Sequence, residues 1–152
     1  SLLKSENPHI LNISPPLDMN PDWFSGHVAY SMAKFGMSLC VLGMAAEFKD
    51  DGVAVNALWP RTAIATAAVK NVLGGEQLVN ISRGPEIMAD AAYVILTKPS
   101  KEFTGNFCID DTLLAENGVS DFSVYADVPF DQLAPDFFVP EDMPPPEAAK
   151  KS

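Results

Sequence analysis

The side chains best suited to chemistry in this sequence are a tyrosine and a lysine four residues apart, in the run Tyr30–Lys34. On a helix this spacing puts both on one face, one turn apart. A free phenol, with a pKa near ~10, is a weak acid–base catalyst at neutral pH. A nearby ammonium stabilises the phenolate and lowers that pKa. The pair is therefore suited to exchanging a proton with an alcohol or carbonyl oxygen while hydride leaves or reaches the adjacent carbon.

The spacing alone is weak evidence, because both residue types are common on helices. The alternative interpretation is a tyrosine that packs beside the aliphatic stem of a lysine. The neighbouring segments favour the chemical interpretation. Tyr30 opens a helix, and that helix follows a short apolar strand that ends in Asn12-Ile13-Ser14 and is stopped by two prolines.

The elements that must position this pair alternate between strands and helices. Periodicity, prolines and glycines predict buried strands over 9–13, 53–59 and 104–110, and helices over 28–48, 66–72 (ending at Gly74-Gly75) and 85–98. Buried strands separated by helices indicate parallel βαβ units and an α/β fold. Three such strands leave both sheet edges open, so the pattern is typical of half a domain.

Four landmarks in this order resemble the short-chain dehydrogenase/reductase family: the strand ending Asn12-Ile13-Ser14, the Tyr30/Lys34 pair, a strand with Val55-Asn56 that ends at Pro60, and a last strand of the form Thr104-Gly105…Asp110. The resemblance implies a Rossmann-type doubly wound parallel sheet, of which residues 1–120 are the C-terminal half. Residues 121–152, rich in acids and proline, are expected to be a tail or linker. Within the family, His9–Pro16, Ala57–Pro60 and Pro135–Phe138 look like a hydroxysteroid-dehydrogenase-like group.

The resemblance also implies roles for individual residues. Tyr30 is the expected acid/base, and Lys34 is expected to bind the nicotinamide ribose. The loop from Pro60 to Thr66, with Arg61 and Thr62, is expected beside the nicotinamide, with the Ile64 backbone near the carboxamide and the Thr66 hydroxyl near the cofactor. The implied cofactor is NADP or NAD, with NADP slightly preferred. The implied reaction is hydride transfer to or from a secondary alcohol or ketone, and the implied substrate is lipid-like or steroid-like.

The sequence departs from the family pattern in three features. Pro15 stands where a second serine is usual, so Ser14 must orient the substrate; its hydroxyl could equally bond to backbone at the strand end. Arg61 follows Pro60 where glycine is usual, and it either reaches a cofactor phosphate or is solvated, the latter being the favoured interpretation. No Gly-rich phosphate-binding turn precedes Ile10. We therefore expect the sequence to be part of a longer polypeptide; the alternative is a first half supplied by another chain.

Composition narrows the possible partners. Twenty acidic and 10 basic residues give a formal net charge of −10, which argues against nucleic acid. No uninterrupted apolar run approaches a membrane span. Cys40 and Cys108 form neither a disulfide framework nor a metal site, and we expect buried, reduced thiols in an intracellular protein.

The 28–48 helix is apolar on nearly every side, which predicts burial in a core or in a homo-oligomer interface. The competing hypothesis is a scaffold protein that keeps the fold without catalysis.

Overall fold

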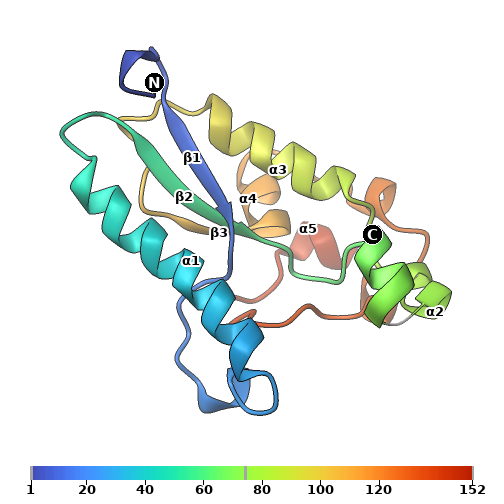
Figure 1. Cartoon of the computed structure of the whole chain (residues 1–152). Coiled ribbons are helices and arrows are strands. Elements are labelled where there is room, and N and C mark those ends of the chain that lie inside the picture. The colour runs from blue at the N-terminus through green and yellow to red at the C-terminus, as the bar shows by residue number, and fades with distance from the viewer. Residues whose placement is uncertain (1, 74, 152) are drawn as a thin grey trace. The chain divides into compact units, whose positions relative to one another are not determined.

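The computed structural model describes residues 2–73 and 75–151 and divides them into two compact units. The first unit comprises residues up to 59 together with 92–108, and the second comprises 60–91 with the residues from 109 onward. The strands are β1 (His9–Ile13), β2 (Ala54–Trp59) and β3 (Phe107–Ile109); the helices are α1 (Val28–Glu47), α2 (Gly75–Asn80), α3 (Glu86–Thr97), α4 (Asp110–Glu116) and α5 (Glu147–Lys150), with a π-helix at Val69–Leu73 and 3-10 helices at Leu2–Lys4, Pro21–Trp23, Ser123–Tyr125 and Phe130–Gln132 (Figure 1).

The strands form one sheet in the order β1-β2-β3. β1 pairs with β2 in parallel, from His9 opposite Ala54 to Ile13 opposite Leu58. Every residue of β2 is buried, as expected for a central strand of a parallel sheet. The parallel α/β arrangement predicted from the sequence is therefore confirmed.

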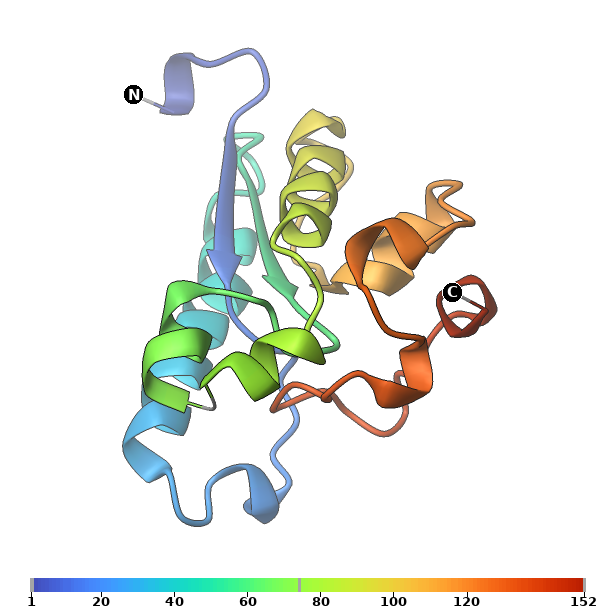
Figure 2. The same ribbon diagram turned by 90° about the vertical axis from the view of Figure 1, so that its right-hand side faces the viewer.

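Helix α1 is the crossover that parallel pairing of β1 and β2 requires. It lies along one face of the sheet, and residues 92–97 of α3 lie on the other side of the strands (Figures 1 and 2). Its buried residues recur every three or four positions: Ser31, Phe35, Ser38, Val41 and Ala45. Val41 and Ala45 pack with Val55 and Ala57 of β2 in one core cluster.

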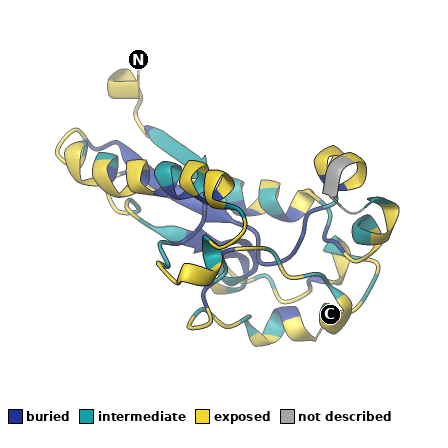
Figure 3. Ribbon diagram, turned by 60° about the horizontal axis from the view of Figure 1, so that its bottom comes forward, coloured by how far each residue is buried: buried dark blue, intermediate teal, exposed yellow. Residues whose placement is uncertain are grey.

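The outer side of α1 is not part of the core of the single chain, so of the two predicted places of burial only the homo-oligomer interface remains for it. Val28, Met32, Leu39 and Leu42 are each more than half exposed in the single chain, and Figure 3 shows much of this helix in the exposed colour. Cys40 on the same side is also exposed, so its expected burial is wrong, whereas Cys108 is buried as expected. By length and composition α1 is apolar enough to span a membrane, but its sheet-facing side packs as a core helix.

The long helix predicted over 28–48 ends where expected: α1 ends at Glu47, and Gly52 beyond it adopts a φ of +71°, which favours glycine. Two other elements depart from their expected bounds. The helix predicted over 66–72 is instead a π-helix one turn later; its predicted end at Gly74 lies outside the described residues, and α2 begins at Gly75. β3 is shorter than expected, since Asp110 begins α4 instead of closing the strand.

A buried asparagine fixes how the chain enters β3. Asn56, within the otherwise apolar β2, donates from Nδ2 to the Phe103 carbonyl at 2.9 Å. Its Oδ1 accepts from both the backbone N–H and the side-chain amide of Asn106, at 3.0 and 2.9 Å. Because a buried amide without partners is costly, this set of bonds holds the segment before β3 against β2.

In the second unit, residues 61–65 lie between two segments that are remote in sequence. Ala63 donates its backbone N–H to Ala134 at 2.9 Å and accepts from the N–H of Arg83 at 2.9 Å. The Ala65 N–H donates to Arg83, and the Asp136 N–H donates to Arg61. The 61–65 segment thus has a backbone neighbour on each side.

The segment expected to be a tail contributes buried side chains to the second unit. Phe122, Phe138 and Ala149 are each at most 1% exposed. The boundary between residues 120 and 121 as the end of the Rossmann half stays a prediction.

Core packing of α1 gives a first testable prediction. Val41→Ala, at a fully buried position, should lower the free energy of unfolding by about 1–3 kcal/mol, because it deletes two packed methyl groups. Val28→Ala makes the same change on the same helix at a 55% exposed position and should change stability by less than about 0.5 kcal/mol. Denaturant unfolding of both variants measures the difference; equal losses would contradict the assignment of the buried face.

Candidate active site

The first group of predicted site residues lies at the carboxyl ends of β1 and β2. Tyr30 and Lys34 are one turn apart on α1, and Tyr30 is 47% exposed. The Lys34 ammonium donates to the backbone carbonyl of Ile13, the last residue of β1, at 3.2 Å. It also lies 5.2 Å from the ring centroid of Trp59, the last residue of β2. The lysine is therefore held where ligands bind in open α/β sheets.

Ser14 follows β1 directly and has an unusual environment. Its backbone N–H donates to Leu58 at 3.2 Å, which extends the β1–β2 pairing by one residue. The residue is 0% exposed, and its hydroxyl has no hydrogen-bond partner among the described residues. The alternative in which the hydroxyl bonds to backbone is therefore wrong. A buried hydroxyl without a partner costs free energy, and a bound substrate oxygen would satisfy it.

Pro15 occupies the position where the family usually has a second serine, and it has a structural role. It is buried, and its carbonyl accepts from the Ser38 hydroxyl at 2.6 Å. That bond fastens the chain after β1 to the middle of α1. Because Lys34 is one turn earlier on the same helix and bonds to Ile13, the two contacts together fix the register between α1 and the end of β1.

The second group, from Pro60 to Thr66, belongs to the second unit. Pro60, Thr62 and Ile64 are buried. The Thr62 hydroxyl has no hydrogen-bond partner among the described residues, and the Ile64 N–H donates to none of them. Thr66 is exposed, and its hydroxyl accepts from the Val69 N–H at 3.3 Å, as a residue capping a helix start does. Open donors on a fixed backbone suit a carboxamide, which offers both a donor and an acceptor.

Arg61 is not solvated, contrary to the favoured interpretation of the sequence: it is 6% exposed. Its Nε donates to both carboxylate oxygens of Asp111, at 2.7 and 2.8 Å. Nη2 donates to the Thr112 hydroxyl at 2.8 Å and to the Pro144 carbonyl at 3.4 Å, and Nη1 donates to the Met143 carbonyl at 2.7 Å. These internal acceptors argue against the alternative contact with a cofactor phosphate.

Arg61 is part of a buried charge cluster that the sequence analysis missed. Arg83, 1% exposed, donates from Nη1 to Asp111 at 3.0 Å, so one carboxylate faces two guanidinium groups. Asp110 accepts at Oδ1 from the backbone N–H groups of Arg61 and Asp111, while its Oδ2 has no partner among the described residues. Burial, and then the charge of Asp111, raise the pKa of Asp110 to about 7.

The sequence held a signal for this cluster. Asp110 and Asp111 directly follow the apolar run of β3, where an acidic pair is unusual unless its charges are paired. What the sequence did not reveal was the partner, because Arg83 lies 28 positions away in a segment without periodicity. Asn56 inside an apolar strand is a second signal of the same kind, a buried polar residue whose partners come from elsewhere.

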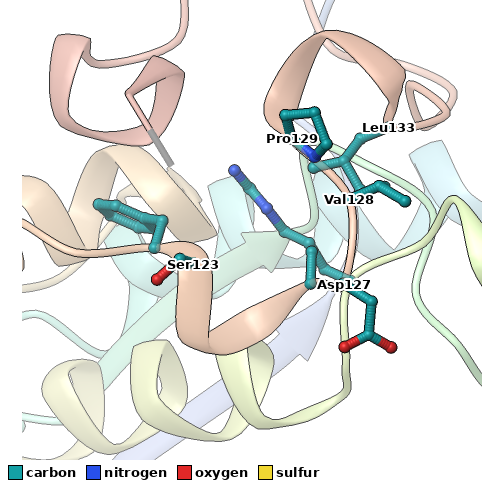
Figure 4. Close-up of a pocket in the computed structure, with 8 residues that line it drawn as sticks. Ser123, Asp127, Val128, Pro129 and Leu133 are labelled. Atoms are coloured by element: carbon teal, nitrogen blue, oxygen red, sulfur yellow. The ribbon is translucent and has the colours of Figure 1, made fainter.

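A pocket of about 280 Å³ in the second unit is lined by Arg83, Phe122 and six other residues between 123 and 133 (Figure 4). Ser123, Asp127, Val128, Pro129 and Leu133 surround it. The guanidinium of Arg83 lies 5.7 and 5.6 Å from the ring centroids of Phe122 and Phe130, and its unpartnered Nη2 is closed off from solvent. None of the site residues predicted from the sequence lines this pocket, so we assign it no role in the chemistry.

The class of protein follows from the strand order, the crossover helix and the position of Tyr30 and Lys34: this is the Rossmann-type fold of the short-chain dehydrogenases. The resemblance predicted from the sequence is confirmed. A putative dehydrogenase from Xanthomonas campestris is 51% identical, with a TM-score of 0.84 over 92% of this chain and 51% of that one. A short chain dehydrogenase from Mycobacterium thermoresistibile is likewise 51% identical, with a TM-score of 0.81 over 93% of this chain and 50% of that one.

Among curated proteins, the chain is similar to hydroxysteroid dehydrogenase-like protein 2. The Danio rerio protein is 57% identical over 145 residues, which are 93% of this chain and 34% of that protein. The chain thus spans about a third of the length of the curated relatives it matches. No family model matches the sequence.

More distant solved structures share the fold alone. A 7α-hydroxysteroid dehydrogenase complexed with NADH is 23% identical, with a TM-score of 0.54 over 71% of this chain and 44% of that one. A putative gluconate 5-dehydrogenase from Beutenbergia cavernae with bound NADP is 22% identical, with a TM-score of 0.56 over 75% and 49%. Dehydrogenases of this fold therefore include proteins that bind either nicotinamide dinucleotide.

The buried cluster predicts a pH dependence of stability. The unfolded Asp110 carboxyl ionises near its ordinary pKa of 3.8, whereas the folded one ionises at about 7. Between these values the folded state holds the extra proton, so the free energy of unfolding falls as pH rises. Asp110→Asn cannot ionise and should lack this fall. Relative to the variant, the parent should therefore lose on the order of a few kcal/mol between about pH 4 and about pH 7.

Denaturant unfolding of the parent and of Asp110→Asn across this pH range measures that difference. Asp131→Asn changes an exposed carboxylate of the same unit and serves as the matched control, whose curve should run parallel to that of the parent. Parallel curves for Asp110→Asn and the parent would contradict the raised pKa of Asp110.

Proposed function

We propose that this chain supplies the catalytic half of an oxidoreductase that transfers hydride between NADP(H) or NAD(H) and a secondary alcohol or ketone. The observation that carries the proposal is Lys34, which lies one helical turn from Tyr30 and donates to the carbonyl of Ile13, the residue directly before Ser14, whose hydroxyl has no partner among the described residues. The similarity to dehydrogenases over nearly the whole chain supports the reaction class.

In this proposal the three side chains divide the work. Tyr30 takes the proton of the substrate alcohol as hydride leaves the carbon, and it returns that proton in the reductive direction. Lys34 stabilises the tyrosinate and binds the nicotinamide ribose. Ser14 donates a hydrogen bond to the substrate oxygen, which stabilises negative charge as it develops there. The bound dinucleotide supplies or accepts the hydride.

The assignment of the 60–66 loop to the nicotinamide rests on the resemblance and on the chemistry of the loop. The open N–H of Ile64 and the unpartnered hydroxyl of Thr62 fit a carboxamide. We also propose that the Thr66 hydroxyl lies near the cofactor, although it caps the helix start by accepting from the Val69 N–H. NADP is slightly preferred, and a lipid-like or steroid-like substrate is proposed from the similarity to hydroxysteroid dehydrogenase-like proteins.

Replacing Tyr30 tests the proposal in the complete polypeptide. Tyr30→Phe removes the acid/base and keeps the ring, so turnover of a secondary alcohol panel with NADP or NAD should fall at least about 100-fold. Dinucleotide affinity, measured by calorimetry or nicotinamide fluorescence, should stay within about twofold of the parent value. Tyr93→Phe, at a 69% exposed tyrosine on α3, is the matched control and should change neither quantity.

A competing function is a scaffold that keeps the fold without catalysis, and Pro15 in place of the usual serine favours it. The two functions differ in one clear result. The scaffold would be supported if the parent protein binds dinucleotide and Tyr30→Phe lowers the turnover rate of none of the substrates. A loss of turnover confined to Tyr30→Phe would exclude it.

We also propose that the exposed apolar side of α1 is buried in a homo-oligomer. Leu39 and Leu42 are 58% and 54% exposed in the single chain, although α1 carries no charged residue between Lys34 and Glu47. An exposed apolar stripe of this length is typical of an interface. Leu39→Glu combined with Leu42→Glu should convert the oligomer to a monomer, since paired copies would bury four carboxylates.

Sedimentation of the parent and of this double variant measures the oligomeric state. Met19→Glu, at a 70% exposed residue outside α1, should leave it unchanged. A parent protein that sediments as a monomer at micromolar concentration would contradict the interface.

A further inference from the structure

A segment near the C-terminus contributes to the fixed geometry of the 61–65 loop. Residues 130–144, which we name the C-terminal strap, contact the backbone of the loop through two hydrogen bonds that together form one antiparallel bridge. Thr62 pairs with Pro135 in an antiparallel bridge, the Ala63 N–H donates to Ala134 at 2.9 Å, and the Asp136 N–H donates to Arg61 at 2.9 Å. On the loop's other side, Ala63 and Ala65 bond to the backbone of Arg83.

The side chain of Arg61 fastens the far end of the strap to the same loop. Its Nη1 and Nη2 donate to the carbonyls of Met143 and Pro144. Both carbonyls belong to a proline-rich stretch, where proline nitrogens lack an N–H and regular secondary structure is excluded. Because this stretch has few backbone donors of its own, a side-chain donor is needed to hold it in place.

The cluster beneath the loop sets the direction of the guanidinium. Both carboxylate oxygens of Asp111 accept from Nε of Arg61, and the Thr112 hydroxyl accepts from Nη2 at 2.8 Å. Asp111 also faces Arg83, which is held by its contacts with two aromatic rings. A planar guanidinium with donors in fixed directions meets this set of acceptors, whereas the single ammonium of a lysine does not.

We propose that Arg61 is a positioning residue for the cofactor loop: it locks the C-terminal strap onto residues 61–65 and so fixes the Ile64 N–H and the Thr62 hydroxyl that face the nicotinamide. This inference rests on the proposed function. According to this inference, the strap contributes to cofactor binding by fixing the loop, although the strap itself need not touch the cofactor. Because coupling between two binding events is reciprocal, dinucleotide binding must in turn tighten the strap.

Amide hydrogen exchange and dinucleotide titration, both on the complete polypeptide, test this inference. Arg61→Lys keeps the charge and loses the fork of donors. In this variant the amides of Ala134, Asp136 and Ala63 should exchange at least about 10-fold faster without cofactor, because the bonds that protect them open more often. The Kd for NADPH or NADH should rise about 10- to 100-fold, since misplaced loop donors bind the carboxamide poorly.

A second variant keeps the test valid where Arg61→Lys fails to fold. Thr112→Val removes a single acceptor of Arg61 and should shift exchange and affinity in the same direction by a smaller factor. Lys150→Gln, which breaks an exposed ion pair with Glu147 in α5, is the control and should change neither quantity. NADPH added to the parent should slow exchange of the strap amides.

The outcomes separate this inference from the proposed function. Faster strap exchange with an unchanged Kd, or unchanged exchange, would overturn the positioning role and leave the proposed function intact. A parent protein that binds neither dinucleotide would overturn the proposed function, and the role of Arg61 toward the cofactor would fall with it. Weaker binding in Arg61→Lys together with normal binding in Tyr30→Phe supports both.

Discussion

The parallel pairing of β1 with β2 is the constraint on which the site depends. Two neighbouring parallel strands cannot be joined by a tight turn, so the chain must cross over the sheet, and α1 is that crossover. Once it is made, both strands end at the same edge of the sheet. Lys34 reaches the last carbonyl of β1 and lies beside the last ring of β2 because α1 runs back along these two strands. Tyr30 shares its helical face one turn earlier.

The second unit depends on a different interaction, the sharing of one buried carboxylate by two arginines. Taking charges out of water is costly, and Asp111 offsets this only because Arg61 and Arg83 both bond to it directly. The neighbouring Asp110 has no partner at Oδ2 among the described residues, and burial, then the charge of Asp111, raise its pKa. The cluster joins three stretches of sequence that secondary structure alone does not connect, and its members are mutually dependent.

The sequence predicted those features that depend on local pattern. The strand at 9–13, the buried run of β2 and the long helix between them follow from apolar periodicity and from prolines and glycines at their ends. The Tyr30/Lys34 pair was predicted for the same reason, since a four-residue spacing fixes relative position on a helix. The partners of Arg61 were not predictable, because a side chain's environment depends on contacts between distant segments. Composition predicted burial of α1 but could not distinguish the side that packs in the core from the side that is exposed in the single chain.

The two cysteines occupy opposite environments, since Cys40 is exposed on α1 and Cys108 is buried in β3. Thiols react with electrophiles according to their access to solvent as well as their ionisation. The molecule thus carries a natural labelling position on the very helix side that exposes apolar residues, without any engineered cysteine. A maleimide dye or spin label placed there would report the surroundings of that helix while the interior thiol stays silent.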